Sequence, residues 1–300
     1  AQGICIANLD LWPYDFPAIW RDNDAAFRAV SSRLPWAVGN VISRNHIHHC
    51  GVTDSFGAAN HPHGLNTEGN VISHNHIHDQ PHHAIYLSMG FGRNVIEYND
   101  LHKLCRAMAD AGGVDSNRWC ILEEDPVLNR GLIVRYNRIR DVMGVLPHAQ
   151  AAQDPATTPS RDRIVRPHMT WGIYFDNSPR RAQVYGNLCM DNTWGGVFLG
   201  GGYAEPEGCV VENNILIDGR DSQVQYSGYV RGGHPVPMMT DTWNKFHGTP
   251  AYDKYPGYRE LTESLDDAWQ MAGNEFVRNI VCYREPSARL FAHYNLPYDK

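Results

Sequence analysis

A ten-residue phrase occurs twice in this chain almost unchanged. Residues 39–48 read GNVISRNHIH and residues 69–78 read GNVISHNHIH, with only Arg44 replaced by His74. Self-similarity at a spacing of a few tens of residues is typical of repeat architectures, in which each unit packs only on its neighbours. Weaker copies of the phrase follow at residues 93–102, 131–140, 182–189, 209–217 and 274–281.

Each copy has the periodicity of a β-strand interrupted by a bend. In the first copy, Val41, Ile42 and Ile47 are apolar and β-branched, and polar residues fall between them. Asn45 lies at the bend, and asparagine tolerates left-handed backbone angles. If each copy is one coil, these side chains stack and form an internal ladder that satisfies buried amides. The equivalent positions are Asn75, Asn99, Asn137, Asn187, Asn214 and Asn279.

The distances along the chain between these asparagines are 30, 24, 38, 50, 27 and 65 residues. A minimum in the mid-twenties, with larger values from loop insertions, favours one coil per repeat. We therefore predict an all-β fold, a parallel β-helix (solenoid), as a single domain over residues 1–300. Leucine-rich repeats have a similar period, but their leucine signature is missing here.

A second strand type lies between the copies of the phrase. Residues 84–88, 172–176 and 196–200 each run small, apolar, aromatic, apolar, and residues 110–116 occupy the equivalent place in their own coil. We expect these segments to form another sheet.

Two segments depart from the coil pattern. Residues 146–168 are rich in proline, alanine and polar residues and are predicted to be a long loop. Residues 218–272 are predicted to be a second insertion, with a short amphipathic helix at roughly 257–271. Long loops on a regular scaffold are common binding sites.

Composition excludes several classes of protein. The net charge is −7 and the basic residues form no stripe, which argues against nucleic acid as a partner. No run of 18 apolar residues predicts a membrane span. The seven cysteines contain no CxxC pair, so neither a zinc ribbon nor a disulfide framework is indicated, and most should be buried thiols.

Ten of the sixteen histidines lie between residues 46 and 83. His46 and His76 share one register of the repeat, and His48, His78 and His102 share another. We interpret these histidines as products of the repetition and predict no metal site and no cofactor. A tight acidic cluster that would indicate Ca²⁺ is also absent from the sequence.

Two carboxylates carry the chemical hypothesis. Asp110 opens the DAGGVDS segment, and Asp176 ends the GIYFD strand of the next coil. Two such aspartates on one face can act as acid and base, or acid and nucleophile, on a glycosidic bond. Their separation would set the outcome, at roughly 5–5.5 Å for retention and 6.5–9.5 Å for inversion of configuration.

The expected substrate contacts lie near these aspartates. His82 and His83 precede a strand and lie outside the repeated phrase, and Asp115 is a reserve carboxylate interpreted as a solvated loop charge. Indole rings at loop edges could stack on a sugar face, whereas rings on an inward strand face would be core. The remaining candidates are Arg118, Trp119, Trp171, Tyr174 and Trp194.

The order of these motifs resembles glycoside hydrolase family 141 and its uncharacterised relatives. The resemblance covers roughly residues 39–283, through segments such as GNVISHNHIHDQPHHAIYL, RNVIEYNDLHKLCRAMADAGG, GIYFDN and VYGNLCMDNTWGGVFLGGG. It implies a right-handed β-helix that lacks several N-terminal coils here. It also implies α-L-fucosidase or xylanase activity on plant cell-wall polysaccharide.

The family's aspartate in a D-A-G segment and its strand-ending aspartate map onto Asp110 and Asp176. Ala109 and Asn177 stand where relatives often carry further aspartates. The resemblance therefore leads us to expect a secreted or periplasmic glycoside hydrolase that acts on a polysaccharide or oligosaccharide.

Two alternatives remain open. A polysaccharide lyase or uronate epimerase on the same fold would need a base, for which His82, His83 or Arg118 could serve. A non-catalytic carbohydrate-binding solenoid would keep the coils without the catalytic pair.

Overall fold

The computed structural model describes residues 4–7, 37–50, 60–63, 67–88, 93–117, 131–147, 164–165, 169–176, 181–200, 208–227 and 273–294. Every regular element in these ranges is a β-strand, and none of them contains a helix. The all-β prediction is confirmed. The predicted helix at 257–271 lies outside the described residues.

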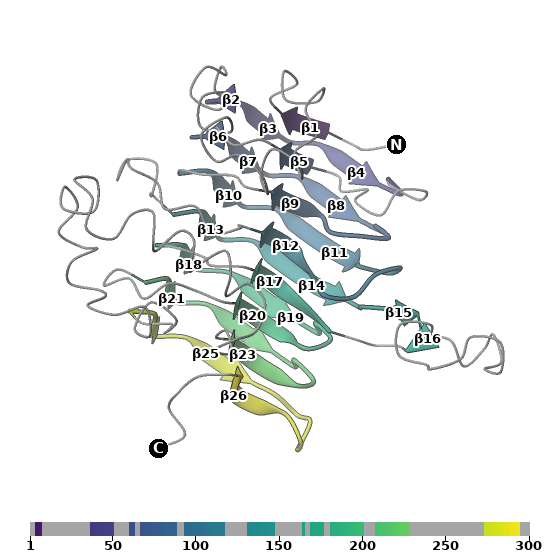
Figure 1. The fold of residues 1–300 in the computed structure, drawn as a ribbon, viewed down its shortest axis with the longest axis vertical. Helices are drawn as coiled ribbons and strands as arrows, with labels where there is room; N and C mark the ends of the chain where they lie inside the picture. The colour runs from purple at the N-terminus through teal and green to yellow at the C-terminus, as the bar shows by residue number, and fades with distance from the viewer. Residues whose placement is uncertain are drawn as a thin grey trace, which may run out of the picture.

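Nearly all the strands belong to three parallel sheets, which we number 1 to 3 (Figure 1). Sheet 1 has, in spatial order, β1 (Ile4–Ala7), β5 (Asn60–His63), β9 (Ile85–Ser88), β12 (Ala111–Asn117), β17 (Thr170–Asp176), β20 (Gly195–Gly200), β23 (Ser222–Ser227) and β26 (Arg289–Tyr294). Sheet 2 has β3 (Val41–Ser43), β7 (Val71–Ser73), β10 (Val95–Glu97), β13 (Ile133–Arg135), β18 (Gln183–Tyr185), β21 (Val210–Glu212) and β24 (Glu275–Val277).

Each strand of sheet 3 directly follows a strand of sheet 2 in the sequence. It has β4 (His46–His48), β8 (His76–His78), β11 (Asp100–Leu104), β14 (Arg138–Val142), β19 (Leu188–Met190), β22 (Ile215–Ile217) and β25 (Ile280–Cys282). Two small pairs complete the described strands. β2 (Ala37–Val38) pairs in parallel with β6 (Thr67–Glu68), and β15 (Leu146–Pro147) pairs antiparallel with β16 (Ile164–Val165).

The chain passes through sheets 2, 3 and 1 in that order, and it does so seven times within the described residues. We call one such passage a repeat. Strands from successive repeats are neighbours in each sheet, so β1 and β26 lie at opposite ends of the stack (Figure 1). The arrangement is compatible with the predicted parallel β-helix. The segments expected to form another sheet, which include residues 110–116, all lie in sheet 1.

The core is built by equivalent apolar residues of successive repeats. In sheet 2, Ile42, Ile72 and Ile96 are aligned by the strand register and buried. Sheets 2, 3 and 1 continue the same pattern with Val134, Val184, Ile77, Leu101, Ile139, Val114, Ile173 and Val197. Cys105, Cys189 and Cys209 are buried free thiols, as predicted for most cysteines, whereas Cys282 is exposed.

The predicted asparagine ladder is present at the bend between sheets 2 and 3. The Oδ1 atom of Asn137 accepts hydrogen bonds from the backbone nitrogen and from Nδ2 of Asn99, at 3.0 and 2.9 Å. Asn137 Nδ2 in turn donates to Asn187 Oδ1 and to the Ile96 carbonyl. The same pattern links all seven bend residues, from Asn45 to Asn279.

The backbone explanation of the bend needs a correction. The left-handed residue is the one before each asparagine, for example Arg44, His74 and Tyr98, with φ between 53° and 58°. The asparagine itself is held by its side-chain hydrogen bonds. The left-handed turn is therefore formed by the preceding residue, and the asparagine stabilises the bend through its side-chain hydrogen bonds.

A second ladder was not predicted. Asn40 Nδ2 donates to Asn70 Oδ1, and Asn70 Nδ2 donates to Asn94 Oδ1, at 2.9 and 3.0 Å. These residues share one position of the repeated phrase, two before the first inward isoleucine. The second ladder could therefore have been predicted from the sequence, because Asn40, Asn70 and Asn94 occupy the same position in successive copies of the phrase.

Both predicted insertions also need correction where they are described. The ends of the first, at 146–147 and 164–165, form the antiparallel β15–β16 pair rather than irregular loop. The second begins later than residue 218, because Ser222–Ser227 is a strand of sheet 1. The sequence analysis missed this strand because polar residues, Gln223 and Gln225, flank the inward-facing Val224. Both glutamines are nevertheless buried.

The ladder predicts a position-dependent cost of removing one asparagine. Asn137→Ala leaves buried partners of both Oδ1 and Nδ2 unsatisfied, so we expect a loss of about 3 kcal/mol or more. Asn279→Ala is the matched control at the less buried end of the ladder, where we expect about 1 kcal/mol. Urea midpoints measured by far-ultraviolet circular dichroism would test this. Equal losses in the two variants would contradict it.

Candidate functional site

Most of the candidate residues converge on the outward side of sheet 1. Val114 and Ile173 point into the core, so the alternation of a strand turns Asp115 and Tyr174 outward. The register aligns Asp115 with Tyr174, and Tyr174 with Phe198 on the next strand. These outward side chains are nevertheless buried. This part of sheet 1 is therefore covered and is not an ordinary solvated strand face.

An aromatic cluster separate from the main core forms the centre of this face. Trp171, Tyr174 and Phe198 are buried together, and Met169 and Trp194 pack against them. The Tyr174 and Phe198 rings stack with their centroids 4.6 Å apart. Trp171 lies 4.5 Å from Phe198 by the same measure and contacts Trp194 edge-on at 5.4 Å.

The chain bends sharply at the start of β12. A Cβ built on Gly112 would lie 2.5 Å from the Cβ of Tyr174, although Gly112 is paired in register with Trp171. In straight strands these positions would be about 10 Å apart along the sheet. Gly112 is required here because no side chain fits. The bend brings the beginning of β12 towards Tyr174.

Asp110 lies immediately before this bend. It is exposed, has a left-handed backbone with φ of 56°, and donates its backbone N–H to the Met169 carbonyl at 2.8 Å. The Tyr174 hydroxyl donates a hydrogen bond to Asp110 Oδ1 at 2.6 Å. The carboxylate is therefore both accessible and fixed in position.

Asp176 is the last residue of β17, two residues beyond Tyr174 and on the same side of the strand. A Cβ on the neighbouring Gly200 would clash with the Phe198 ring and come within 3.3 Å of Asp176 Oδ1, so glycine leaves room for the ring and, to a lesser extent, for the carboxylate. Burial raises the pKa of the Tyr174 hydroxyl, and the charges of Asp176 and Asp110 raise it further. Tyr174 therefore stays protonated, and both carboxylates act on the same phenol.

Asp115 differs from the prediction of a solvated loop charge. It is 2% exposed, and its Oδ2 lies 3.1 Å from His83 Nδ1 and 3.2 Å from the backbone nitrogen of Gly112, which donates to it. Burial raises the pKa of the Asp115 carboxyl, while His83 acts in the opposite direction. The prediction of a solvated loop charge was wrong because Asp115 lies within β12, and its outward-facing side chain is buried.

The other candidates differ in how far they are buried. His82 and His83 are buried, with His82 Nδ1 3.0 Å from the Met108 sulfur and His83 stacked on Tyr86. Trp171 was expected to be an exposed ring, but it is 1% exposed because it packs inside the aromatic cluster. Trp194 is half-buried at the cluster's edge. Arg118 and Trp119 lie outside the described residues.

Histidines on a different face could hold a metal ion. Two groups in the described residues have their ligand atoms within 4.8 Å of one another: His46, His76 and His78, and His76, Asp100 and His102. Both lie on sheet 3, away from Asp110 and Asp176 on sheet 1. The registers that the sequence predicted for these histidines are confirmed by the strand pairing.

Comparisons with known proteins identified no significantly similar protein. No family model matches the chain, and neither a curated protein nor a solved structure is significantly similar to it. Within the described residues, no helix is long and apolar enough to cross a membrane.

The raised pKa of Asp115 predicts a pH-dependent stability difference. Between the unfolded value of about 3.9 and the higher folded value, the native state binds more protons, so stability contributed by this group falls as pH rises. We expect Asp115→Asn to gain stability relative to the unmodified protein as the pH rises from acid to neutral. Urea midpoints across that range would show it.

Asp191→Asn provides the control, because Asp191 is exposed on another repeat and its left-handed backbone suits asparagine. The pH dependence of Asp115→Asn is compared with that of Asp191→Asn. A relative stability of Asp115→Asn that declines towards neutral pH would refute the assignment.

Proposed function

We propose that the chain is a right-handed parallel β-helix that works as a glycoside hydrolase on a complex, plant cell-wall-type polysaccharide or oligosaccharide. The cyclic passage through three parallel sheets supports the β-helix, and parallel crossover connections are overwhelmingly right-handed. The motif order that resembles glycoside hydrolase family 141 supports the chemistry.

The observation that carries the proposal is the pair of aspartates around Tyr174. Asp110 accepts the phenolic hydrogen bond, and Asp176 follows two residues after the same ring. Hydrolysis of a glycosidic bond needs two carboxyl groups, one to protonate the leaving oxygen and one to act as base or nucleophile. Asp110 and Asp176 are the residues we assign to these tasks.

The aromatic cluster suits a sugar ligand. Trp194 is half-buried and leans edge-on against the fully buried Trp171, so its position is fixed by packing. A rigid, partly exposed indole ring presents an apolar surface of the kind that stacks on a sugar ring. Trp194 is therefore the proposed platform, and Trp171 supports it from below.

The state of Tyr174 favours hydrolysis over elimination. A lyase needs a base that removes a proton beside a carboxylate, whereas the raised pKa of Tyr174 keeps its proton on the ring. His82 and His83 are further candidate bases, but both are buried, with His82 Nδ1 at the Met108 sulfur and His83 Nδ1 3.1 Å from Asp115. None of these three groups is poised to abstract a proton from a substrate.

Replacing the aspartates singly tests the proposal. Asp110→Asn and Asp176→Asn should each lower kcat by about 10²–10⁴-fold, because each removes a group that transfers a proton or attacks the sugar. The assay would use a panel of aryl glycosides and plant cell-wall polysaccharides, with Asp191→Asn as the matched exposed control.

Full activity in both aspartate variants would contradict the assignment. Release of an unsaturated product that absorbs ultraviolet light would indicate a lyase instead. Binding to glycans by the unmodified protein without any turnover would indicate a carbohydrate-binding solenoid.

A further inference from the structure

The outward side of sheet 3 carries a grid of imidazoles. The inward residues Ile47 and Ile77 are buried, so the histidines that flank each of them point outward from β4 and β8. The register aligns His46 with His76 and His48 with His78. His102 continues the second row on β11.

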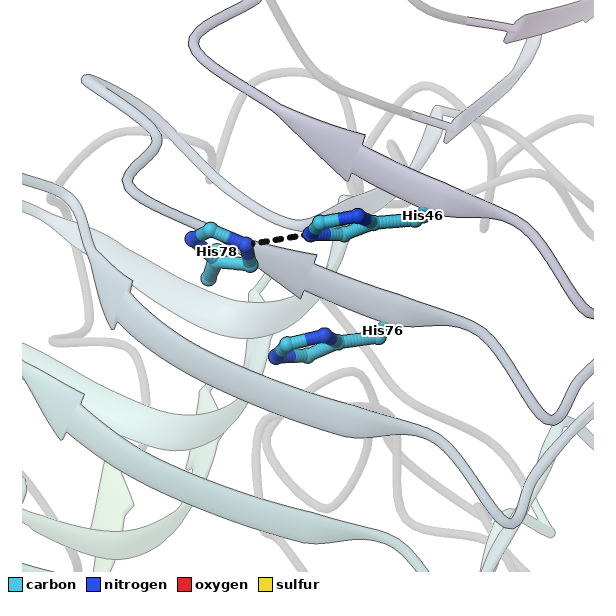
Figure 2. Close-up of side chains that lie close together, drawn as sticks. All are labelled: His46, His76 and His78. Carbon is cyan, nitrogen blue, oxygen red and sulfur yellow. Dashed lines mark hydrogen bonds between the residues drawn. The ribbon is translucent and has the colours of Figure 1, made fainter.

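Strand spacing sets the distances within this grid. The His46 and His76 rings stack at 4.9 Å with 4° between their planes, close to the roughly 4.8 Å between paired strands. The Nε2 atoms of His46 and His78 are 2.7 Å apart (Figure 2). Figure 2 shows His46, His76 and His78 converging from two neighbouring strands.

These separations match a metal site of nitrogen ligands. Tetrahedral zinc with Zn–N bonds of 2.0–2.1 Å places its ligand nitrogens about 3.3 Å apart. The ligand atoms of His46, His76 and His78 lie within 4.8 Å of one another, and the closest pair is at 2.7 Å. Metal binding would require the parallel His46 and His76 rings to rotate towards a common point, with His76 Nε2 leaving its 2.8 Å contact with His102 Nε2. A fourth position would be open to solvent beside the exposed His46.

Asp79 is placed to orient His78 for a metal. His78 Nδ1 lies 2.7 Å from Asp79 Oδ2, and in the neutral tautomer that donates Nδ1–H to this carboxylate, Nε2 faces His46 with its lone pair. Arg106 donates to the other Asp79 oxygen at 2.9 Å and fixes the carboxylate. A carboxylate that orients a histidine in this way is the usual support of a bound metal.

Asp79 occupies a position that recurs along sheet 3. The strand register makes His49, Lys103, Asp141, Asp191 and Asp218 its equivalents in other repeats, all with left-handed backbones. Aspartate is therefore common at this position, but Asp79 is the one whose carboxylate contacts a histidine of the grid, whereas Asp141 and Asp218 bind arginines. The observations that point to a ligand are this Asp79–His78 contact and the proximity of the three histidines.

The second histidine group is less suited to a cation. Both oxygens of Asp100 accept hydrogen bonds from Arg138, at 2.9 and 2.5 Å, so they are already neutralised. Arg140 is aligned with His102 and places a further positive charge beside it. The site therefore consists of His46, His76 and His78.

We propose that His46, His76 and His78 bind one divalent transition-metal ion of the zinc class, with Asp79 as a positioning residue for His78. Three imidazole donors favour such ions over Ca²⁺ and Mg²⁺, which prefer oxygen. β4 is the edge strand of sheet 3, so the ion would tie the first complete repeat to the second. The site is independent of the aspartates on sheet 1.

Calorimetric titration with Zn²⁺ tests the site directly, using the full chain without a polyhistidine tag. We expect one ion per chain. His46→Ala and His78→Ala should each abolish or greatly weaken this binding, and Asp79→Asn should weaken it about 10–100-fold. The unmodified protein should also unfold at a higher temperature with Zn²⁺ present.

His74→Asn is the matched control, because His74 is exposed, lies outside the grid and has a left-handed backbone that asparagine adopts. It should bind Zn²⁺ unchanged. All proteins would carry Cys282→Ser, which removes the exposed free thiol of the described residues as a competing ligand.

Absence of stoichiometric Zn²⁺ binding, or binding by the His46→Ala and His78→Ala variants with the affinity of the parent protein, would overturn the proposal. Circular dichroism would establish that each variant is folded, which is expected since His46 is exposed. Substitution with Co²⁺ gives a second readout, because a four-coordinate nitrogen site absorbs in the visible without a thiolate charge-transfer band. Neither measurement depends on glycosidase activity.

Discussion

The hydrogen bonds between asparagines at the bend are the interaction on which the repeats depend. The bend turns the backbone out of sheet 2, where buried N–H and C=O groups would otherwise lack partners. Each asparagine side chain satisfies the asparagine of the preceding repeat and one of its carbonyls, as Asn137 does for Asn99 and Ile96. The ladder therefore fixes the vertical register of every repeat.

Because the register is fixed, the position of a residue within its repeat determines where it lies on the surface of a sheet. Residues at the same position of successive repeats become neighbours at strand spacing, whatever the length of chain between them. Tyr174 thus lies beside Asp115, although 59 residues separate them, and His46 lies beside His76. The two proposed sites therefore lie on different faces, with the aspartates at sheet 1 and the imidazole grid on sheet 3.

The two proposed sites use the repeated scaffold differently. Gly112 departs from the repeated pattern and bends β12, and this bend lets the Tyr174 phenol reach Asp110. Asp79 keeps an aspartate position that recurs in several repeats, but there it contacts His78. In both places one residue holds its neighbour in a defined position, as expected of functional residues on a regular scaffold.

The sequence by itself determined the strand periodicity, the asparagine ladder at the bend, the histidine registers and four neighbouring strands of sheet 1, because each depends on a local pattern that repeats. Only the tertiary structure decided which outward side chains are buried. The sequence analysis interpreted Asp115 as a solvated loop charge and Trp171 as an exposed ring, but both are buried. The alternation of residues along a strand does not indicate whether other parts of the chain cover the outer face of its sheet. The tertiary structure also paired Asp115 with His83, and His78 with both His46 and Asp79. Those contacts depend on side-chain directions across strands and on local bends, which no single segment of the chain encodes.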